Sequence, residues 1–276
     1  MRILIIGAGG MLGNLTQRYL KERGHDVTGV TKTKKLPGII NLDVLDETAL
    51  TAFLNETPFD VVINCAALLV GPSESHHAEA VKLNAWLPHF LEGFYAESGT
   101  YIIQVSTDGV FSGLTGSYGE SDCSDTESFY GKSKYLGELQ NQKDLTVRSG
   151  FWGADLNPHG AGLFQWFMRQ RGPVLGFTRA LFNGISNLEF AKFTEEAMQS
   201  RWSGIFHLCA SDTISKYQFL ALQNRVFSRN VQIDRREDIA VDRSLQNARS
   251  DIAYRRKSFE RMMEELRDYM AGREGF

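Results

Sequence analysis

The chain has 276 residues, 42% of them hydrophobic and 23% charged, with a formal net charge of −3. This is the composition of a globular chain with a sizeable core, and the slight acidity argues against a general nucleic-acid binder. No apolar run reaches membrane-spanning length, and the first is too short for a signal peptide, so we expect a cytoplasmic protein without membrane contact.

The most informative local pattern opens the chain. An apolar, β-branched run at 2–6 predicts a buried strand, and 14–23 predicts a helix. Between them, Gly7, Gly10 and Gly13 fit the spacing G-x-x-G-x-x-G. Such glycines allow a tight turn, close approach to a pyrophosphate and close helix packing, and the helix N-terminus supplies free N–H groups. We expect a dinucleotide site here, with a ligand-free glycine turn as the alternative.

The end of the second predicted strand, 25–30, favours one cofactor. NAD-binding chains of this kind carry an acidic residue there for the ribose 2′-hydroxyl. This chain has Thr31 and Lys32, followed by one threonine and two lysines. Hydroxyls and lysines suit a 2′-phosphate, so NADP(H) is favoured and NAD(H) stays open. A solvated lysine loop is the alternative.

A short strand at 39–42 leads into Asp43, which is placed to face the adenine edge or to cap the helix predicted at 47–55. The next strand, 59–64, ends in Asn64-Cys65-Ala66-Ala67, where small residues let the backbone lie against a cofactor. A long helix follows at 75–96, bent or restarted near Pro88.

The strand at 100–105 ends in Ser106-Thr107-Asp108. Chemistry gathers at the carboxyl ends of parallel strands, so the Thr107 hydroxyl is placed to bond a substrate carbonyl. Tyr130 and Lys134 stand four residues apart in a segment that predicts a helix running to Gln140, which puts both on one helical face. The pair predicts proton transfer in alcohol–carbonyl chemistry, aided by the cation that favours an ionised phenol.

These motifs occur together and in one order: the glycine loop, Asn64-Cys65-Ala66-Ala67, Asn84, residues 106–111 and Tyr130-Gly-Lys-Ser-Lys134. Together they resemble an extended short-chain dehydrogenase/reductase, closest to the dTDP-4-dehydrorhamnose reductase branch. The resemblance is dense to about residue 150 and looser beyond. It departs at Gly109, where the branch usually has an aromatic residue, and at Cys65, where it usually has alanine.

The resemblance implies the fold and the site. We expect an α/β fold, a Rossmann-type doubly wound parallel sheet over 1–150 with returning C-terminal segments, and a smaller interleaved α/β substrate lobe over 151–276. The implied catalytic residues are Tyr130, Lys134 and Thr107. The implied cofactor-binding residues are Gly7, Gly10, Met11, Leu12, Gly13, Thr31, Lys32, Asp43, Val44, Cys65, Ala66, Ala67, Asn84, Ser106, Tyr130 and Lys134.

The C-terminal half offers candidates for substrate binding. With Asp108, these are Trp152, which could stack on a sugar or base but is equally a core residue, and the arginines Arg179, Arg243 and Arg249. A guanidinium matches diphosphate geometry, although any single arginine is more often a solvated charge. Cys65, Cys123 and Cys209 are far apart, which predicts a reducing compartment and no metal site.

The predicted function is NAD(P)H-dependent reduction of a keto group on a nucleotide-linked sugar, by a chain that could form a homodimer. Two alternatives stay open. One is an epimerase that retains NAD. The other is a non-catalytic nucleotide-binding regulatory subunit, because the regulatory subunit of methionine adenosyltransferase also resembles this branch.

Overall fold

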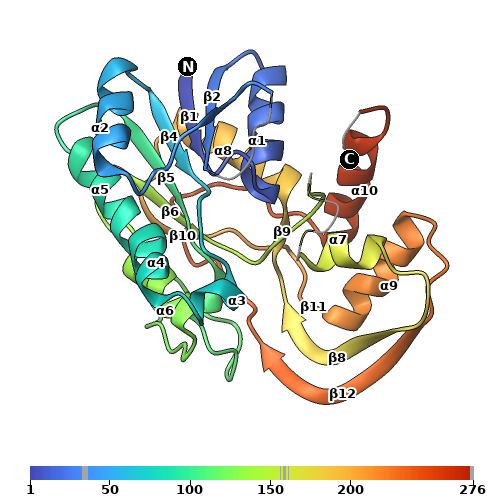
Figure 1. The fold of residues 1–276 in the computed structure, drawn as a ribbon. Coiled ribbons are helices and arrows are strands. Elements are labelled where there is room, and N and C mark those ends of the chain that lie inside the picture. The colour runs from blue at the N-terminus through green and yellow to red at the C-terminus, as the bar shows by residue number, and fades with distance from the viewer. Residues whose placement is uncertain (33–36, 156, 158–159, 161, 274–276) are drawn as a thin grey trace.

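A computed structural model describes residues 1–32, 37–155, 157, 160 and 162–273. Its centre is a seven-stranded sheet whose paired strands all run parallel (Figure 1). In sheet order the strands are β10 (Gly204–His207), β6 (Leu145–Arg148), β5 (Tyr101–Val105), β4 (Val61–Asn64), β1 (Arg2–Ile6), β2 (Asp26–Thr31) and β3 (Ile39–Asn41). The order reverses between β1 and β4, which places a ligand crevice at their carboxyl ends.

Helices cover both faces of the sheet, which confirms the Rossmann-like α/β prediction (Figure 1). Side chains alternate along β1: Ile3 and Ile5 join one core cluster and Leu4 and Ile6 the other. The first face carries α1 (Met11–Glu22) and α8 (Asn187–Ser200), with α10 (Phe259–Met270) packed against α8, and the second carries α2 (Glu47–Glu56) and α5 (Leu87–Phe94).

The smaller lobe is built largely from the second half of the chain. A three-stranded sheet has β8 (Val174–Phe182) between β11 (Ile214–Ser215) and β12 (Ile233–Asp242), and β7 (Phe151–Trp152) pairs with β9 (Ile185–Ser186). Two helices complete the lobe, α7 (Leu163–Met168) and α9 (Lys216–Val226). Because β10 and α8 return to the large sheet, the halves are interleaved; the boundary near residue 150 stays a prediction.

The helix predicted at 75–96 is found as three consecutive segments, α4 (His77–Ala80), the π-helical turn η1 (Val81–Trp86) and α5, so the predicted bend or restart near Pro88 is present. A separate short helix, α3 (Val70–Ser73), precedes them. Pro88 lies in the first turn of α5, where a missing backbone N–H costs nothing. The irregularity therefore falls before the proline, at a π turn, and such turns are frequent at functional sites.

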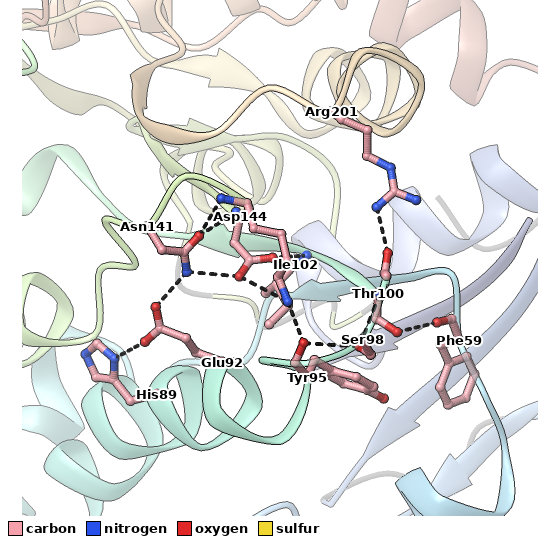
Figure 2. A network of polar contacts seen from close by, with 12 residues as sticks. Phe59, His89, Glu92, Tyr95, Ser98, Thr100, Ile102, Asn141, Asp144 and Arg201 are labelled. Atoms are coloured by element: carbon pink, nitrogen blue, oxygen red, sulfur yellow. Dashed lines mark hydrogen bonds and ion pairs between the residues drawn. The ribbon is translucent and has the colours of Figure 1, made fainter.

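A polar network ties together the amino ends of the strands, opposite the expected site (Figure 2). The buried Asp144 carboxylate accepts from the Ile102 N–H at 2.8 Å. Asn141 donates to both Asp144 and Glu92, and Glu92 also contacts His89. The amino ends of these strands are thus fixed by the network, and the loops at their carboxyl ends are left to carry the functional residues.

Candidate active site

Tyr130 and Lys134 lie on α6 (Phe129–Leu136), whose N-terminus is capped by the Ser128 side chain accepting from the Gly131 N–H. Tyr130 is half-buried and Lys134 is 2% exposed. The helix ends at Leu136, with Gly137 as its C-cap, so the predicted continuation to Gln140 is wrong. An alanine Cβ at Gly137 would lie 1.9 Å from the Asn84 carbonyl oxygen, so the chain turns where only glycine fits.

The structure brings Thr107 next to Tyr130. Thr107 follows β5 and caps the 3₁₀ turn η2 (Asp108–Val110), accepting from the Gly109 N–H at 3.0 Å. A Cβ on Gly109 would lie 3.3 Å from the Thr107 hydroxyl oxygen and 3.5 Å from Cε1 of the Tyr130 ring. Gly109 therefore lies against both hydroxyl-bearing residues, and its missing side chain leaves room for their side chains to meet.

The two ionisable groups on α6 differ in what surrounds them. Burial raises the pKa of Tyr130 to about 12, opposed by its hydrogen bond with Thr107. Burial lowers the pKa of Lys134 to about 8. The Lys134 ammonium donates to the Val105 carbonyl at 2.6 Å and is not among the groups that shift the Tyr130 pKa, so the expected lowering of the phenol pKa by this cation is not found. Tyr130 thus keeps its proton at neutral pH, as a proton donor must.

The glycine loop has the geometry of a phosphate cradle. Gly7 has a φ of +83°, and a Cβ there would lie 2.8 Å from the Ala66 N. At Gly13 a Cβ would lie 2.4 Å from the Gly7 carbonyl oxygen, so helix and strand pack as closely as a dinucleotide fold requires. Gly10 makes no side-chain cap for α1, and the first turn contains no acidic residue. Met11 and Leu12 open this uncapped turn, so a dinucleotide pyrophosphate fits here.

The adenosine side of the loop is only partly described, since residues 33–36 lie outside the described part of the chain. Thr31 is buried at the end of β2, against Gly9. Lys32 forms an ion pair with Asp43 at 2.9 Å, and Asp43 also accepts from the Leu45 N–H. The alternative role of Asp43 as a helix cap is wrong, because Asp46 caps α2. Val44 is buried in the core beside them.

The segment after β4 faces the same crevice. Asn64 is fully buried and its side-chain oxygen accepts from the Ala66 N–H, which fixes the Cys65-Ala66-Ala67 turn beside Gly7. Burial raises the pKa of the Cys65 thiol to about 12, and the Lys134 charge opposes this rise. Cys65 is therefore a neutral thiol between the loop and the catalytic helix.

Two residues predicted to bind cofactor have side chains committed elsewhere. The Asn84 amide donates to the Leu68 carbonyl and the Ser133 hydroxyl and accepts from the Leu68 N–H. The Ser106 hydroxyl donates to Glu138 at 2.6 Å. Both side chains therefore fix the loops around the site. The prediction that Asn84 and Ser106 bind the cofactor can then concern only their backbone groups.

Three charged side chains from different elements meet beside Thr107. Asp108 accepts from the Thr107 hydroxyl at 3.2 Å, and the charges of Lys216 and Asp108 act on each other. The Lys216 ammonium lies 3.4 Å from the centroid of the Phe182 ring, and burial, with the Arg243 charge, lowers its pKa to about 8. The Arg243 Nε is buried and has no hydrogen-bond partner within the described residues. The site thus holds more positive than negative charge.

The other substrate candidates lie elsewhere. Trp152 is 2% exposed, packs with Phe164, Phe219 and Phe259, and donates to the Gly184 carbonyl, so it is a core residue and not a stacking platform. Arg249 pairs with Asp251 and donates to the carbonyls of Ser203 and Ile205, at the amino end of β10. That end is opposite the site, so substrate contact by Arg249 does not fit. Arg179 is exposed on β8.

Sequence reasoning missed Lys216 and Glu138. Lys216 is the first residue of α9, and no local pattern pointed to it. Glu138 was expected on a continuing helix; the helix-ending glycine at 137 is the signal that could have revealed its turn into the interior. Within the described residues, no group of three metal-ligating side chains forms, and no helix is long and apolar enough to cross a bilayer.

Comparison with known families now adds to this geometry. The model of the RmlD substrate binding domain matches residues 1–149. The chain belongs to this family. The probable low-salt glycan biosynthesis reductase Agl14 of Haloferax volcanii is 30% identical, over 79% of this chain and 78% of its own length. The methionine adenosyltransferase 2 subunit beta of Danio rerio is 32% identical, over 50% of this chain and 43% of its own.

Solved structures agree with this membership. A hypothetical dTDP-4-dehydrorhamnose reductase from Sulfolobus tokodaii superposes with a TM-score of 0.80 at 28% identity, covering 92% of this chain and 95% of that one. A dTDP-4-dehydrorhamnose reductase from Bacillus anthracis, solved in complex with NADP, has a TM-score of 0.85 at 20% identity, over 98% and 99% of the chains. The predicted resemblance to this reductase branch is confirmed.

Proposed function

We propose that the chain reduces a keto group on a nucleotide-linked sugar, with NADPH as the reductant. The observation that carries this proposal is the placement of Tyr130 and Thr107 around Gly109, at the strand ends that also carry the glycine loop. A proton donor, a second hydroxyl and a dinucleotide cradle therefore share one crevice, as carbonyl reduction requires.

Each residue has a defined task. Bound NADPH supplies the hydride. Tyr130 donates its proton to the developing alkoxide oxygen, and Thr107 holds that oxygen through its hydroxyl. The buried Lys134 ammonium compensates the negative charge left on the phenolate. The Thr107 hydroxyl has one proton, which it donates to Asp108 in the structure, so this hydroxyl must turn from Asp108 toward the substrate oxygen when the substrate binds.

The charge beside the site supports a diphosphate-linked substrate. Lys216 and Arg243 are half-buried cations for which no ion pair forms within the described chain. Leaving cations desolvated and unpaired is costly unless a ligand supplies the anion. A sugar nucleotide carries two phosphates and meets this need, whereas a free sugar does not.

NADPH is preferred to NADH on the basis of Thr31 and Lys32, with the remaining lysines of that loop outside the described residues. Agl14, a probable reductase, and the NADP complex of the Bacillus anthracis enzyme are consistent with the proposal. A reducing, cytoplasmic location agrees with the three free cysteines, and a homodimer stays a prediction.

The test is a thermal-shift screen of dTDP- and UDP-linked keto sugars with NADPH or NADH, followed by turnover assays on the stabilising pairs. We expect one keto-sugar nucleotide to be reduced with one NADPH consumed per product. Tightly bound NAD with an epimerised product would instead support the epimerase. The match to methionine adenosyltransferase 2 subunit beta keeps a regulatory subunit as second candidate; co-migration with a synthetase and no turnover would favour it.

A further inference from the structure

A charged network lies buried directly behind the proposed active site. Glu138 follows α6, and its side chain is fully covered. Arg148 on β6 pairs with both carboxylate oxygens, from Nε to Oε1 at 2.8 Å and from Nη2 to Oε2 at 2.7 Å. Bidentate pairs of this kind fix the geometry of both partners, so the carboxylate has one defined position.

The same carboxylate is tied to the strand end that carries Thr107. The Ser106 hydroxyl donates to Glu138 Oε1 at 2.6 Å, and the Ser106 N–H donates to the Val147 carbonyl. Ser106 is therefore held from both sides, one residue before Thr107. Any movement of Glu138 is passed on to the hydroxyl that is proposed to hold the substrate oxygen.

Glu138 also acts on the catalytic lysine. The Lys134 ammonium is buried, and within the described chain no carboxylate lies at ion-pair distance from it. Burial lowers its pKa to about 8, and the Glu138 charge is the largest opposing influence, followed by Cys65. The Val105 carbonyl on β5 accepts from the ammonium at 2.6 Å.

The ionisable groups on the other side of Arg148 do not take the place of the Glu138 charge near Lys134. The His207 Nε2 lies 3.3 Å from Arg148 Nη1, and burial lowers the pKa of His207 to about 4, so it is neutral. Glu120 accepts from the His207 N–H on the far side of the arginine. Glu138 is thus the carboxylate of this network whose charge reaches Lys134.

We propose that Glu138 is a positioning residue of the active site: its carboxylate fixes Ser106 and, through it, Thr107, and places a negative charge behind the Lys134 ammonium, which the neighbouring Val105 carbonyl holds. The role of Glu138 in turnover rests on the proposed function, whereas its effect on the protonation of Lys134 is independent of any substrate. A purely structural Arg148–Glu138 pair would stabilise the fold without setting the protonation of Lys134.

Three variants separate charge from shape. Glu138→Gln keeps the side-chain size and its acceptor oxygen but removes the charge, whereas Glu138→Asp keeps the charge. Glu92→Gln is the matched control, since Glu92 also accepts from an asparagine and contacts a histidine, in the network at the opposite edge of the sheet.

Lysine side-chain NMR measures the titration directly, with the Lys134 signal assigned by its absence in Lys134→Met. We expect the Lys134 midpoint to fall by about 1 pH unit or more in Glu138→Gln, and to stay near its wild-type value in Glu138→Asp and Glu92→Gln. An unchanged midpoint in Glu138→Gln overturns the proposal. If that variant does not fold, Glu138→Gln combined with Arg148→Met is compared with Arg148→Met alone, in which the Glu138 carboxylate is present without its partner; the Lys134 midpoint must be lower in the double variant.

The pH dependence of turnover is the second measurement. The alkaline loss of kcat/KM should move to lower pH in Glu138→Gln by the same interval as the lysine midpoint, and not in the two other variants. A midpoint that falls while the rate profile stays in place overturns the link to catalysis. A wild-type protein with no turnover on any keto-sugar nucleotide would instead refute the proposed function and leave the NMR result intact.

Discussion

The Asn84 side-chain amide donates to the Ser133 hydroxyl at 3.0 Å, which joins the π turn η1 to the helix that carries Tyr130 and Lys134. The same amide closes two hydrogen bonds with the backbone of Leu68. One buried side chain therefore connects the loop after β4, the π turn and the catalytic helix. The position of Tyr130 depends on all three.

Replacing Asn84 by alanine should lower the free energy of unfolding by about 1–3 kcal/mol, because buried backbone groups of Leu68 lose their partner. Urea unfolding measures the change. Asn55→Ala, on the exposed side of α2, is the control and should change stability by less than about 0.5 kcal/mol. Equal effects of the two substitutions would show that the Asn84 bonds contribute nothing specific.

Tyr130→Phe removes the proposed proton donor and little else. We expect kcat to fall about 10²–10⁴-fold, while NADPH affinity stays within a factor of about three, because the ring still fills its place beside Gly109. Steady-state kinetics and a calorimetric binding titration separate the two effects. Wild-type turnover in this variant would remove Tyr130 from the mechanism.

Gly13→Ala should abolish dinucleotide binding and destabilise the fold, because its Cβ would lie 2.4 Å from the Gly7 carbonyl oxygen. Gly93 on α5 is the matched glycine, with nothing within 4 Å of an added Cβ. Gly93→Ala should leave binding unchanged and raise the free energy of unfolding by up to about 1 kcal/mol. Retained NADPH binding in Gly13→Ala would contradict the cradle.

Arg243→Gln should raise KM for a nucleotide-linked substrate about tenfold or more, with a smaller effect on kcat, since the lost contact is to a part of the substrate that does not react. Arg225→Gln on α9 is the control, because Arg225 is exposed and pairs with Glu260. If KM for the sugar nucleotide is the same in both variants, the diphosphate is bound elsewhere.

Stability should depend on pH in a defined window. Burial lowers the pKa values of Lys134 and Lys216 to about 8, so between about pH 8 and pH 10 these two side chains bind more protons in the unfolded chain than in the folded one. They therefore raise the free energy of unfolding across this window, whereas the buried Cys65 and Cys209 thiols, whose pKa values are raised, lower it from about pH 9 upward. Above about pH 10 the raised pKa values of Tyr130 and Tyr95 reverse the trend, because the unfolded tyrosines lose their protons first.

Urea unfolding at a series of pH values measures this contribution: the free energy of unfolding should rise less with pH in Lys134→Met than in the wild-type protein. The same pH dependence in both proteins would show that the Lys134 ammonium is hydrated in the folded chain.

Local patterns predicted the large sheet well, because β1 and β4 are short apolar runs and the glycine loop has a fixed spacing. The π turn escaped prediction, since one extra residue in a helix leaves no mark on its composition. Lys216 and Glu138 escaped for another reason: their environments are made by strands and loops distant in sequence. Trp152 was a substrate candidate because it follows a strand of the sheet. The structure buries it against three phenylalanines from distant parts of the chain, which its sequence position could not reveal.

Strand β10 has a consequence for how the protein is made. It borders β6 in the sheet, yet it lies far along the chain, after all of the catalytic residues. While a ribosome is still extending the second half, β6 is an open edge whose backbone groups can pair with another chain. Arg148 on β6 also lacks its contact with His207 until β10 has been made. A nascent chain stalled before residue 204 therefore already contains Thr107, Tyr130 and Lys134, but in an unfinished and aggregation-prone sheet.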